Sequence, residues 1–207
     1  MKEVDEIVVV DYGCGNLESV VNIIEHVGGY SEISSDPKVI RKYPKIILPG
    51  VGHFKHGMEC LKKSGLIPVL EEKRKSGAKI MGICLGMQLM TAFSEEGNCD
   101  GLGWFPVKTV RFPSEVEGKK LVVPHMGWNT VSVEDDTTDV VQNDSRFYFV
   151  HSYYVDAVGE ECCLTSSTYG GVDFASGIQR ENLFGFQFHP EKSHSNGMKL
   201  FKEFLKI

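Results

Sequence analysis

The segment from Lys79 to Met90 leaves this chain few possible folds. An apolar run ends there in a Gly-x-Cys-x-Gly pattern over residues 82–86, and apolar residues at helical spacing follow at once. The two glycines indicate a tight strand-to-helix turn, because side chains there would collide with the strand or the helix. The pattern predicts a nucleophile elbow that exposes Cys84 at the positive end of a helix, where a thiolate is favoured. Taken alone, it also fits a buried free cysteine in a glycine-rich turn.

Two further apolar runs show the same organisation. Ile7–Val10 and Lys45–Leu48 both end in glycine-containing loops, and a helical pattern over residues 17–27 follows the first. Apolar strands that alternate with helices are typical of a parallel sheet covered on both faces, with its site at the carboxyl ends of the strands. The loop Asp11–Asn16 lacks the third glycine of a dinucleotide-binding fingerprint, so a simple turn is favoured over a phosphate site.

After about residue 98 the pattern changes to short strand-like pieces separated by Gly, Asn and Asp turns. We therefore predict an α/β fold in one domain, 1–207, with a largely parallel central sheet flanked by helices and an antiparallel extension with hairpins in the C-terminal half. The helix after Cys84 should run to about Phe93, and further helices are expected over 58–63, 66–75 and 195–206. The later strands are expected at 105–112, 121–123, 130–133, 147–150, 162–168, 174–179 and 183–188, with polar turns or surface loops at 115–120 and 135–144.

Composition narrows the function classes. The 22 basic and 28 acidic residues leave a net charge of −6, which argues against nucleic acid or an anionic membrane as the main partner. No apolar run approaches membrane-spanning length, and the acidic start lacks the features of a secretory signal. The six cysteines show no disulfide spacing, so they are interpreted as reduced thiols in a cytoplasmic protein.

One possible metal motif is present and incomplete. His53, His56 and Cys60 could share one face of a helix. No carboxylate or second cysteine completes the set of ligands, so the sequence predicts no metal.

The second chemical motif lies a hundred residues after the elbow. Leu183–Phe188 is expected to be a strand, and His189-Pro190-Glu191 follows it. Residues two apart in an extended segment point the same way, so Glu191 can reach one imidazole nitrogen while the other faces a nucleophile. A thiol nucleophile needs a base, and the base needs an acceptor that orients it. Cys84, His189 and Glu191 are therefore predicted to form a catalytic triad.

A third motif could complete the site. In Pro49-Gly50-Val51-Gly52, two glycines surround one valine at the end of a strand, which lets the backbone approach a ligand closely. The amide of Val51 is thus a candidate oxyanion donor, although a plain loop is the alternative.

Residues 82–88 together with residues 185–191 resemble the triad-type (class I) glutamine amidotransferases, over essentially the whole chain. Within this class, residues 11–17, 49–52, 124–129 and 149–153 are similar to glutaminase subunits of imidazole glycerol phosphate synthases. The resemblance implies that Cys84 attacks the glutamine carboxamide, that His189 protonates the leaving ammonia and later activates water, and that Glu191 orients His189. It also implies a heterodimer with a (β/α)8-barrel synthase, which would use the ammonia to make imidazole glycerol phosphate and an aminoimidazole carboxamide ribonucleotide in histidine biosynthesis.

The resemblance implies further roles, and no cofactor or metal. The amides of Leu85 and Val51 would form the oxyanion hole, and Val51 would be presented correctly only when a loaded partner is bound. The residues expected to hold glutamine are Gly50, Gly52, Gln88, Glu96, Ser152 and Tyr153. The residues expected at the partner interface are Met126, Trp128, Tyr148 and Lys192, with Trp128 in a short loop.

Three other functions stay open at this point. A similar glutaminase could supply ammonia to a paralogous barrel that aminates another metabolite, such as a surface sugar precursor. A cysteine peptidase or other hydrolase would use the same nucleophile, base and carboxylate. The last alternative, a non-catalytic binding module, is disfavoured because Cys84, His189 and Glu191 are all present.

Overall fold

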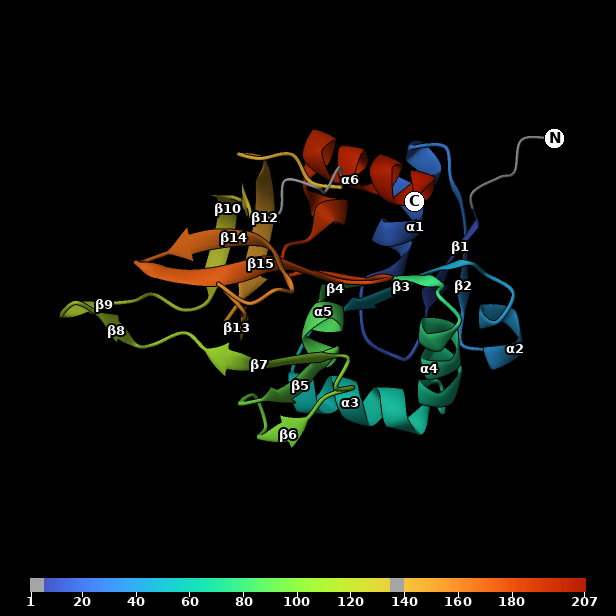
Figure 1. The fold of residues 1–207 in the computed structure, drawn as a ribbon, viewed down its shortest axis with the longest axis horizontal. Helices are drawn as coiled ribbons and strands as arrows, with labels where there is room; N and C mark the ends of the chain where they lie inside the picture. The colour runs from blue at the N-terminus through green and yellow to red at the C-terminus, as the bar shows by residue number, and fades with distance from the viewer. Residues whose placement is uncertain (1–5, 135–139) are drawn as a thin grey trace.

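A mixed sheet of twelve strands forms the centre of the protein (Figure 1). The structure, a computed structural model, describes residues 6–134 and 140–207. Five neighbouring strands of the sheet pair in parallel, and all but the edge strand have the largely apolar sequences typical of buried parallel strands. In spatial order they are β2 (Tyr30–Ser34), β1 (Glu6–Val10), β3 (Lys45–Gly50), β4 (Lys79–Cys84) and β16 (Leu183–Phe186).

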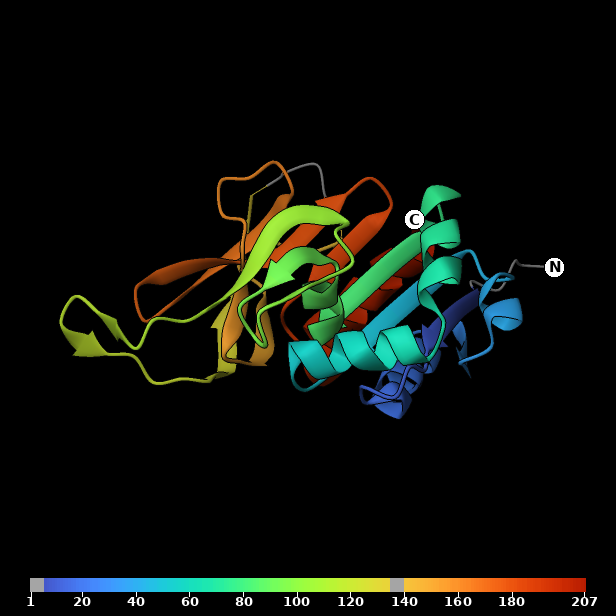
Figure 2. The same cartoon turned by 90° about the horizontal axis from the view of Figure 1, so that it is seen from below.

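Helices cover both faces of this parallel part (Figures 1 and 2). On one face lie α1 (Leu17–His26) and α6 (His194–Lys206), and on the other α3 (Phe54–Lys63) and α4 (Ile67–Lys75). Successive residues of a strand point to opposite faces, so Val8 and Val10 join the core under α3 and α4, whereas Ile7 and Val9 join the core under α1 and α6. A short helix, α2 (Pro37–Ile40), follows β2.

The rest of the sheet is mainly antiparallel and is formed by strands from Thr91 onward. Its strands in order are β15 (Val172–Arg180), β13 (Tyr153–Asp156), β7 (Phe105–Arg111), β5 (Thr91–Ser94) and β6 (Cys99–Asp100), with β14 (Cys163–Tyr169) on β15 and β11 (Ser132–Val133) on β14. Two separate ribbons are β10 (His125–Thr130) with β12 (Arg146–His151), and β8 (Glu115–Val116) with β9 (Lys119–Lys120). The predicted fold class is confirmed.

The helix after Cys84 is shorter than predicted. It is α5 (Leu85–Leu89), and strand β5 begins at Thr91 instead of the helix continuing to Phe93. Other donors occupy the carbonyl groups that a longer helix would use. The Thr91 hydroxyl donates to the Gln88 carbonyl, and the Leu102 amide donates to the Leu89 carbonyl. Hydrogen bonds from Thr91 and Leu102 therefore replace those that a longer helix would make, and the helix ends at Leu89.

Several strand predictions in the middle of the chain were wrong. Residues 126–129, expected as a loop, lie in β10, and residues 121–123, expected as a strand, have no strand structure. The expected strand 130–133 is divided between the end of β10 and β11, and the polar turn 115–120 contains the β8–β9 hairpin. The loop expected at 135–144 lies partly outside the described residues.

Candidate active site

Cys84 ends β4 in a strained backbone conformation, with φ 52° and ψ −108°. Both flanking glycines are required by close contacts. A Cβ at Gly82 would lie 2.7 Å from the amide nitrogen of Met87, and one at Gly86 would lie 1.8 Å from the carbonyl oxygen of Leu48. The turn is thus the tight strand-to-helix elbow that the sequence predicts. The expected exposure of Cys84 was wrong, because the residue is buried and only 7% exposed.

The order of the strands brings the separate motifs together. Gly50 at the end of β3 is paired in register with Cys84, and Phe186 of β16 is paired with Ile83 on the other side. A pocket of about 200 Å³ opens at these strand ends. Its lining residues are Val51, Gly52, Cys84, Leu85, Gln88, Glu96, Val150, His151, Ser152, Tyr153 and His189. Of the predicted catalytic, oxyanion and glutamine-binding residues, Gly50 and Glu191 do not line it.

Glu191 lies behind the pocket and orients His189. The two side chains are almost fully buried, and Nδ1 of His189 donates a hydrogen bond of 2.8 Å to Oε1 of Glu191. Burial acts to lower the pKa of His189, but the neighbouring Cys84 sulfur and the Glu191 carboxylate outweigh it and raise this pKa to about 10. The imidazole is therefore protonated at neutral pH. Its second nitrogen, Nε2, is buried and makes no hydrogen bond to the described part of the chain.

The Pro49–Gly52 segment changes from tightly packed to open within two residues. The Tyr12 hydroxyl donates a 2.7 Å hydrogen bond to the carbonyl of Pro49, and a Cβ at Gly50 would lie only 2.6 Å from that hydroxyl. Gly52, in contrast, has φ +110° and no described atom within 4 Å of an added Cβ. The side chain of Val51 is 43% exposed. Val51 therefore stands at the boundary between a fixed strand end and an open turn.

Gln88 and Gln187 form a buried amide network beside the sulfur of Cys84. The Gln88 amide nitrogen donates to the carbonyl of Tyr153 and to Oε1 of Gln187, both at 3.0 Å. Gln187 then donates to the sulfur of Cys84 at 3.7 Å. With both of its N–H groups used, Gln88 has its carbonyl oxygen to accept a bond from a ligand.

Sequence reasoning missed Gln187, although a signal for it was present. It is the only polar side chain in Phe184-Gly185-Phe186-Gln187-Phe188, and it is completely buried. A polar side chain among buried aromatic residues needs partners, and here the partners are Gln88 and Cys84.

A second buried network that the sequence did not reveal supports the wall of the pocket. Nδ1 of His151 lies 2.8 Å from the carbonyl of Tyr153 and must donate to it, so Nε2 of His151 accepts from Nδ1 of His125 at 3.0 Å. The amide of Asn129 lies 3.4 Å from the last nitrogen of His125. Both rings must be neutral to make this series of hydrogen bonds. Burial favours the neutral form, because it lowers the pKa of His125 to about 4 and that of His151 to about 3.

Glu96 lies at the mouth of the pocket, where it also supports the start of α3. One of its carboxylate oxygens, Oε2, accepts a 2.7 Å hydrogen bond from the backbone amide of Phe54. Because α3 follows the Pro49–Gly52 segment directly, this bond connects the carboxylate to the segment that carries Val51.

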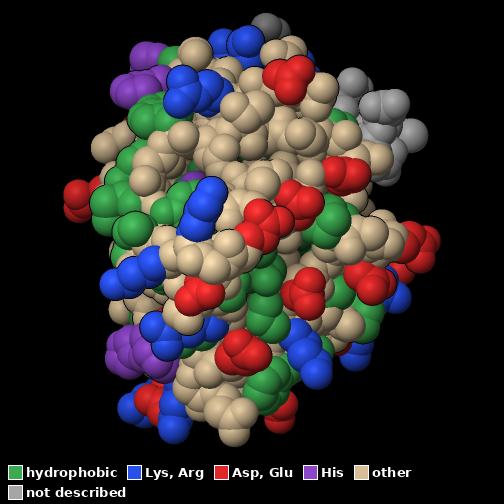
Figure 3. Space-filling view, turned by 90° about the vertical axis from the view of Figure 1, so that its left-hand side faces the viewer, with side chains coloured by type: hydrophobic (Ala, Val, Ile, Leu, Met, Phe, Trp, Pro, Cys, Tyr) green, Lys and Arg blue, Asp and Glu red, His purple; other side chains and the backbone are tan. Residues whose placement is uncertain are grey.

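Three of the four predicted interface residues, Met126, Trp128 and Tyr148, lie on the β10–β12 ribbon. Met126 and Trp128 are 61% and 42% exposed on one face of β10, and Trp128 stands opposite Tyr148 of β12. Met126 is paired with Val150, which lines the pocket, so this face continues to the pocket rim. The exposed Lys192 closely follows Glu191. Figure 3 shows hydrophobic side chains gathered along one edge of this end of the molecule, among basic and histidine side chains.

The site and the fold define a class of protein. A family model described as class-I glutamine amidotransferase matches residues 8–207, and the chain belongs to this family. It is 47% identical over 207 residues to imidazole glycerol phosphate synthase subunit HisH 2 of Pseudomonas aeruginosa, covering 97% of this chain and 99% of the relative. The subunit HisH 2 of Methanococcus maripaludis is 45% identical over 203 residues, covering 97% and 98%. The solved structure of PurLQS from Thermotoga maritima shares the fold, with a TM-score of 0.74 at 19% identity over 97% of both chains.

Proposed function

We propose that this chain hydrolyses L-glutamine to glutamate and ammonia and delivers the ammonia to a (β/α)8-barrel synthase. The partner would use it to form imidazole glycerol phosphate and the aminoimidazole carboxamide ribonucleotide of histidine biosynthesis. The placing of Cys84 and His189 in one pocket, with Glu191 hydrogen-bonded to His189 behind it, carries the catalytic part of the proposal. The full-length similarity to imidazole glycerol phosphate synthase subunits supports the pathway.

In the first chemical step the Cys84 sulfur attacks the carboxamide carbon of glutamine. The oxygen becomes negative in the tetrahedral intermediate, and the amides of Leu85 and Val51 are the donors proposed to stabilise it. His189 begins the step as an imidazolium and gives its Nε2 proton to the leaving nitrogen, so ammonia departs and a thioester remains. Glu191 stabilises the imidazolium and holds the ring in position throughout.

In the second step the neutral His189 removes a proton from water, which attacks the thioester carbon. The second tetrahedral intermediate uses the same oxyanion donors and collapses to the Cys84 thiolate and the carboxylic acid form of the product, which becomes glutamate by releasing its proton to solvent. The proton remains on His189, which restores the thiolate–imidazolium pair for the next turnover.

The remaining residues of the pocket are proposed to hold the substrate. Glu96 can bind the α-ammonium group of glutamine, because it lines the pocket and carries a carboxylate. Gln88 offers its carbonyl oxygen, and residues 152–153 with Gly52 are proposed to provide backbone contacts around the substrate. Gly50 does not line the pocket and is proposed to act through the strand end that carries Val51.

The partner is proposed to dock on the surface made by Met126, Trp128, Tyr148 and Lys192, giving a heterodimer. Trp128 stacks on His194 with the ring centres 5.4 Å apart and the planes 6° apart, so it is held in an exposed position. Large aromatic side chains held in this way are typical anchors of protein interfaces. We also propose a single domain over residues 1–207, a cytoplasmic location and no cofactor. No helix among the described residues has the length and apolar character needed to span a membrane.

The position of Val51 supports activation by the partner. Its amide lies in a segment that is open on the Gly52 side, so the oxyanion hole is proposed to form completely only in the loaded complex. The purified chain alone should then be a poor glutaminase. Strong glutamine hydrolysis without any partner would contradict this part of the proposal.

A different acceptor remains a second candidate, favoured by one observation. Both relatives named above carry the number 2 in their names, as expected where an organism has two such subunits, while a relative from Sulfurimonas denitrificans at 42% identity carries none. A second subunit could serve a paralogous barrel that aminates another metabolite, such as a sugar.

One experiment tests the proposal and separates these candidates. Glutamate release is measured for the chain alone, with a barrel synthase of the histidine pathway, and with that synthase and its ribonucleotide substrate. We expect a rate increase that requires both additions, together with formation of imidazole glycerol phosphate. Glutaminase activity that this synthase never stimulates would reject the histidine pathway and favour another acceptor. No glutaminase activity under any condition would reject the function itself.

A further inference from the structure

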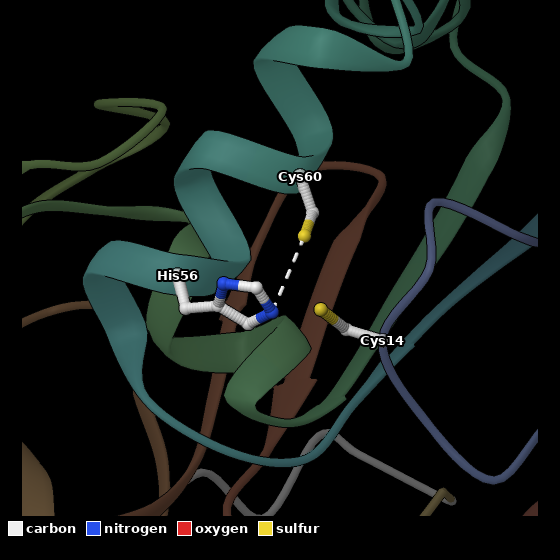
Figure 4. Close-up of side chains that lie close together, drawn as sticks. All are labelled: Cys14, His56 and Cys60. Atoms are coloured by element: carbon white, nitrogen blue, oxygen red, sulfur yellow. Dashed lines mark hydrogen bonds between the residues drawn. The ribbon is translucent and has the colours of Figure 1, made fainter.

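A cluster of two cysteines and one histidine lies outside the active site. The sulfur atoms of Cys14 and Cys60 and one ring nitrogen of His56 all lie within 4.8 Å of one another (Figure 4). Cys14 comes from the loop after β1, whereas His56 and Cys60 are four residues apart on one face of α3. The sequence predicted no metal because no second cysteine completed the motif. The fold supplies that cysteine from the neighbouring loop.

The spacing of the three atoms is close to that of a metal site. The sulfur of Cys60 lies 3.5 Å from Nε2 of His56. Ligand atoms around a tetrahedral zinc ion are roughly 3.5–3.8 Å apart, as follows from bond lengths of about 2.0–2.3 Å. Small side-chain rotations would therefore bring all three atoms to bonding distance of one ion.

We propose that Cys14, His56 and Cys60 bind one zinc ion, with water in the fourth position. Two thiolates and an imidazole suit zinc, while magnesium and calcium require oxygen ligands. Cys14 is buried, Cys60 is half-buried and His56 is exposed, so an ion can enter, and water can bind, from the side of His56.

The charges of the cluster also balance with zinc bound. A zinc ion displaces one proton from each cysteine, and the two thiolates neutralise its charge. The neutral His56 ring gives a nitrogen lone pair and adds no charge.

A zinc ion at this position would connect two elements that lie next to the active-site segment carrying Val51. Cys14 follows Tyr12, whose hydroxyl holds the carbonyl of Pro49, and α3 begins two residues after Gly52. A bound ion would tie the loop after β1 to the first turns of α3. These two elements flank the segment that carries Val51, so zinc would restrict that segment from both sides.

Cobalt(II), which reports its coordination through its absorption spectrum, is a direct probe of this site. The titration is done without oxygen and with a non-thiol reductant, on a Cys84→Ala chain so that the active-site thiol cannot bind the metal. We expect one equivalent of cobalt to give intense tetrahedral bands and a thiolate charge-transfer band, and one equivalent of zinc to remove both. Zinc should also raise the melting temperature.

Variants of the three ligands decide the assignment. In the same background, Cys14→Ser, His56→Ala and Cys60→Ser should each weaken zinc binding by more than about tenfold. Cys162→Ser and His26→Ala, which change the same residue types elsewhere, should not. His56 is exposed, so its replacement leaves the fold intact and gives a result even if Cys14→Ser unfolds the chain. Binding that survives His56→Ala and Cys60→Ser, or the absence of any tetrahedral cobalt spectrum, would overturn the proposal.

Discussion

The two sides of the pocket are built in opposite ways. On one side, Cys84 is 7% exposed and its elbow has no free space, since Gly82 and Gly86 both press against backbone atoms. On the other side, Val51 is 43% exposed and Gly52 borders open space. The proposed nucleophile is therefore held in place before substrate arrives, while the proposed oxyanion donor is less constrained. A site built in this way can be regulated through one backbone segment without disturbing the thiol.

Removing the nucleophile should have the largest effect. Cys84→Ala is expected to reduce glutamine hydrolysis by more than about a thousandfold in the complex with the partner, because no other group can form the thioester. Glutamate release is the measurement, and Cys162→Ser is the matched control, since Cys162 lies away from the pocket. A Cys84→Ala chain with appreciable glutaminase activity would show that the thiol is not the nucleophile.

Alanine substitutions at two glycines test the structural difference directly. Gly86→Ala should destabilise the protein by more than about 3 kcal/mol, because its methyl group would collide with the Leu48 carbonyl 1.8 Å away. Gly52→Ala meets no atom and suffers only from its positive φ, which costs on the order of 1 kcal/mol. Urea unfolding measures both values.

The same pair of variants should distinguish effects on the free energy of unfolding from effects on activation by the partner. Folded Gly52→Ala should keep a normal rate of Cys84 alkylation but respond differently to the partner, since only the Val51 segment is changed. Equal losses of stability in the two variants would show that the two sides are packed alike.

Glu191→Gln tests the fixed side of the pocket. Its expected effect on glutaminase activity is smaller than that of Cys84→Ala. Burial acts against protonation of His189, so loss of the Glu191 charge should lower the His189 pKa from about 10. We expect glutaminase activity to fall by about ten- to a hundredfold, and an NMR titration of the His189 ring to show the lower pKa.

The pKa shift of His189 also predicts a pH dependence of stability. A pKa raised in the folded state stabilises the protein fully below the unfolded value of about 6.5, and this contribution is lost as the pH rises through about 10. In Glu191→Gln the loss should occur at lower pH. Identical alkaline stability curves for the two proteins would argue against a charged Glu191–His189 pair.

The sequence predicted the chemical groups of the site better than the networks that hold them. The elbow and the His-x-Glu motif are local patterns, so their geometry follows from a few neighbouring residues. The pairing of His125 with His151 depends on the alignment of β10 with β12, and Cys14 meets Cys60 only because β1 and β3 are neighbours. Contacts of this kind are set by tertiary structure and leave no local pattern.

Strand β10 was missed for a different reason. Its outward side chains include Met126 and Trp128, which are apolar, while the inward His125 is polar. The usual alternation of buried apolar and exposed polar residues is therefore inverted at these positions. Exposed apolar residues are expected where a partner covers a strand, so the feature that hid the strand also marks the proposed interface.

The smallest expected effect concerns the wall of the pocket that the two histidines support. Burial lowers the pKa of His125 to about 4 and that of His151 to about 3, so the folded protein keeps both rings neutral while the unfolded chain protonates near pH 6.5. Their contribution to stability is present above pH 6.5 and is lost as the pH falls toward 4, by at most about 1.4 kcal/mol per pH unit for each histidine.

Urea unfolding between pH 7.5 and 5 measures this loss before most carboxylates titrate. His125→Phe keeps a ring that can stack on Phe149 and Tyr169, yet removes one titrating group, so its stability should depend less on pH than that of the wild type. His26→Ala removes an exposed histidine and should leave the slope unchanged. If His125→Phe and the wild type lose the same stability as the pH falls, the neutral histidine pair does not stabilise this wall of the pocket. The rigidity of the Cys84 side, compared with the Val51 side, would then come from the packing of the elbow alone.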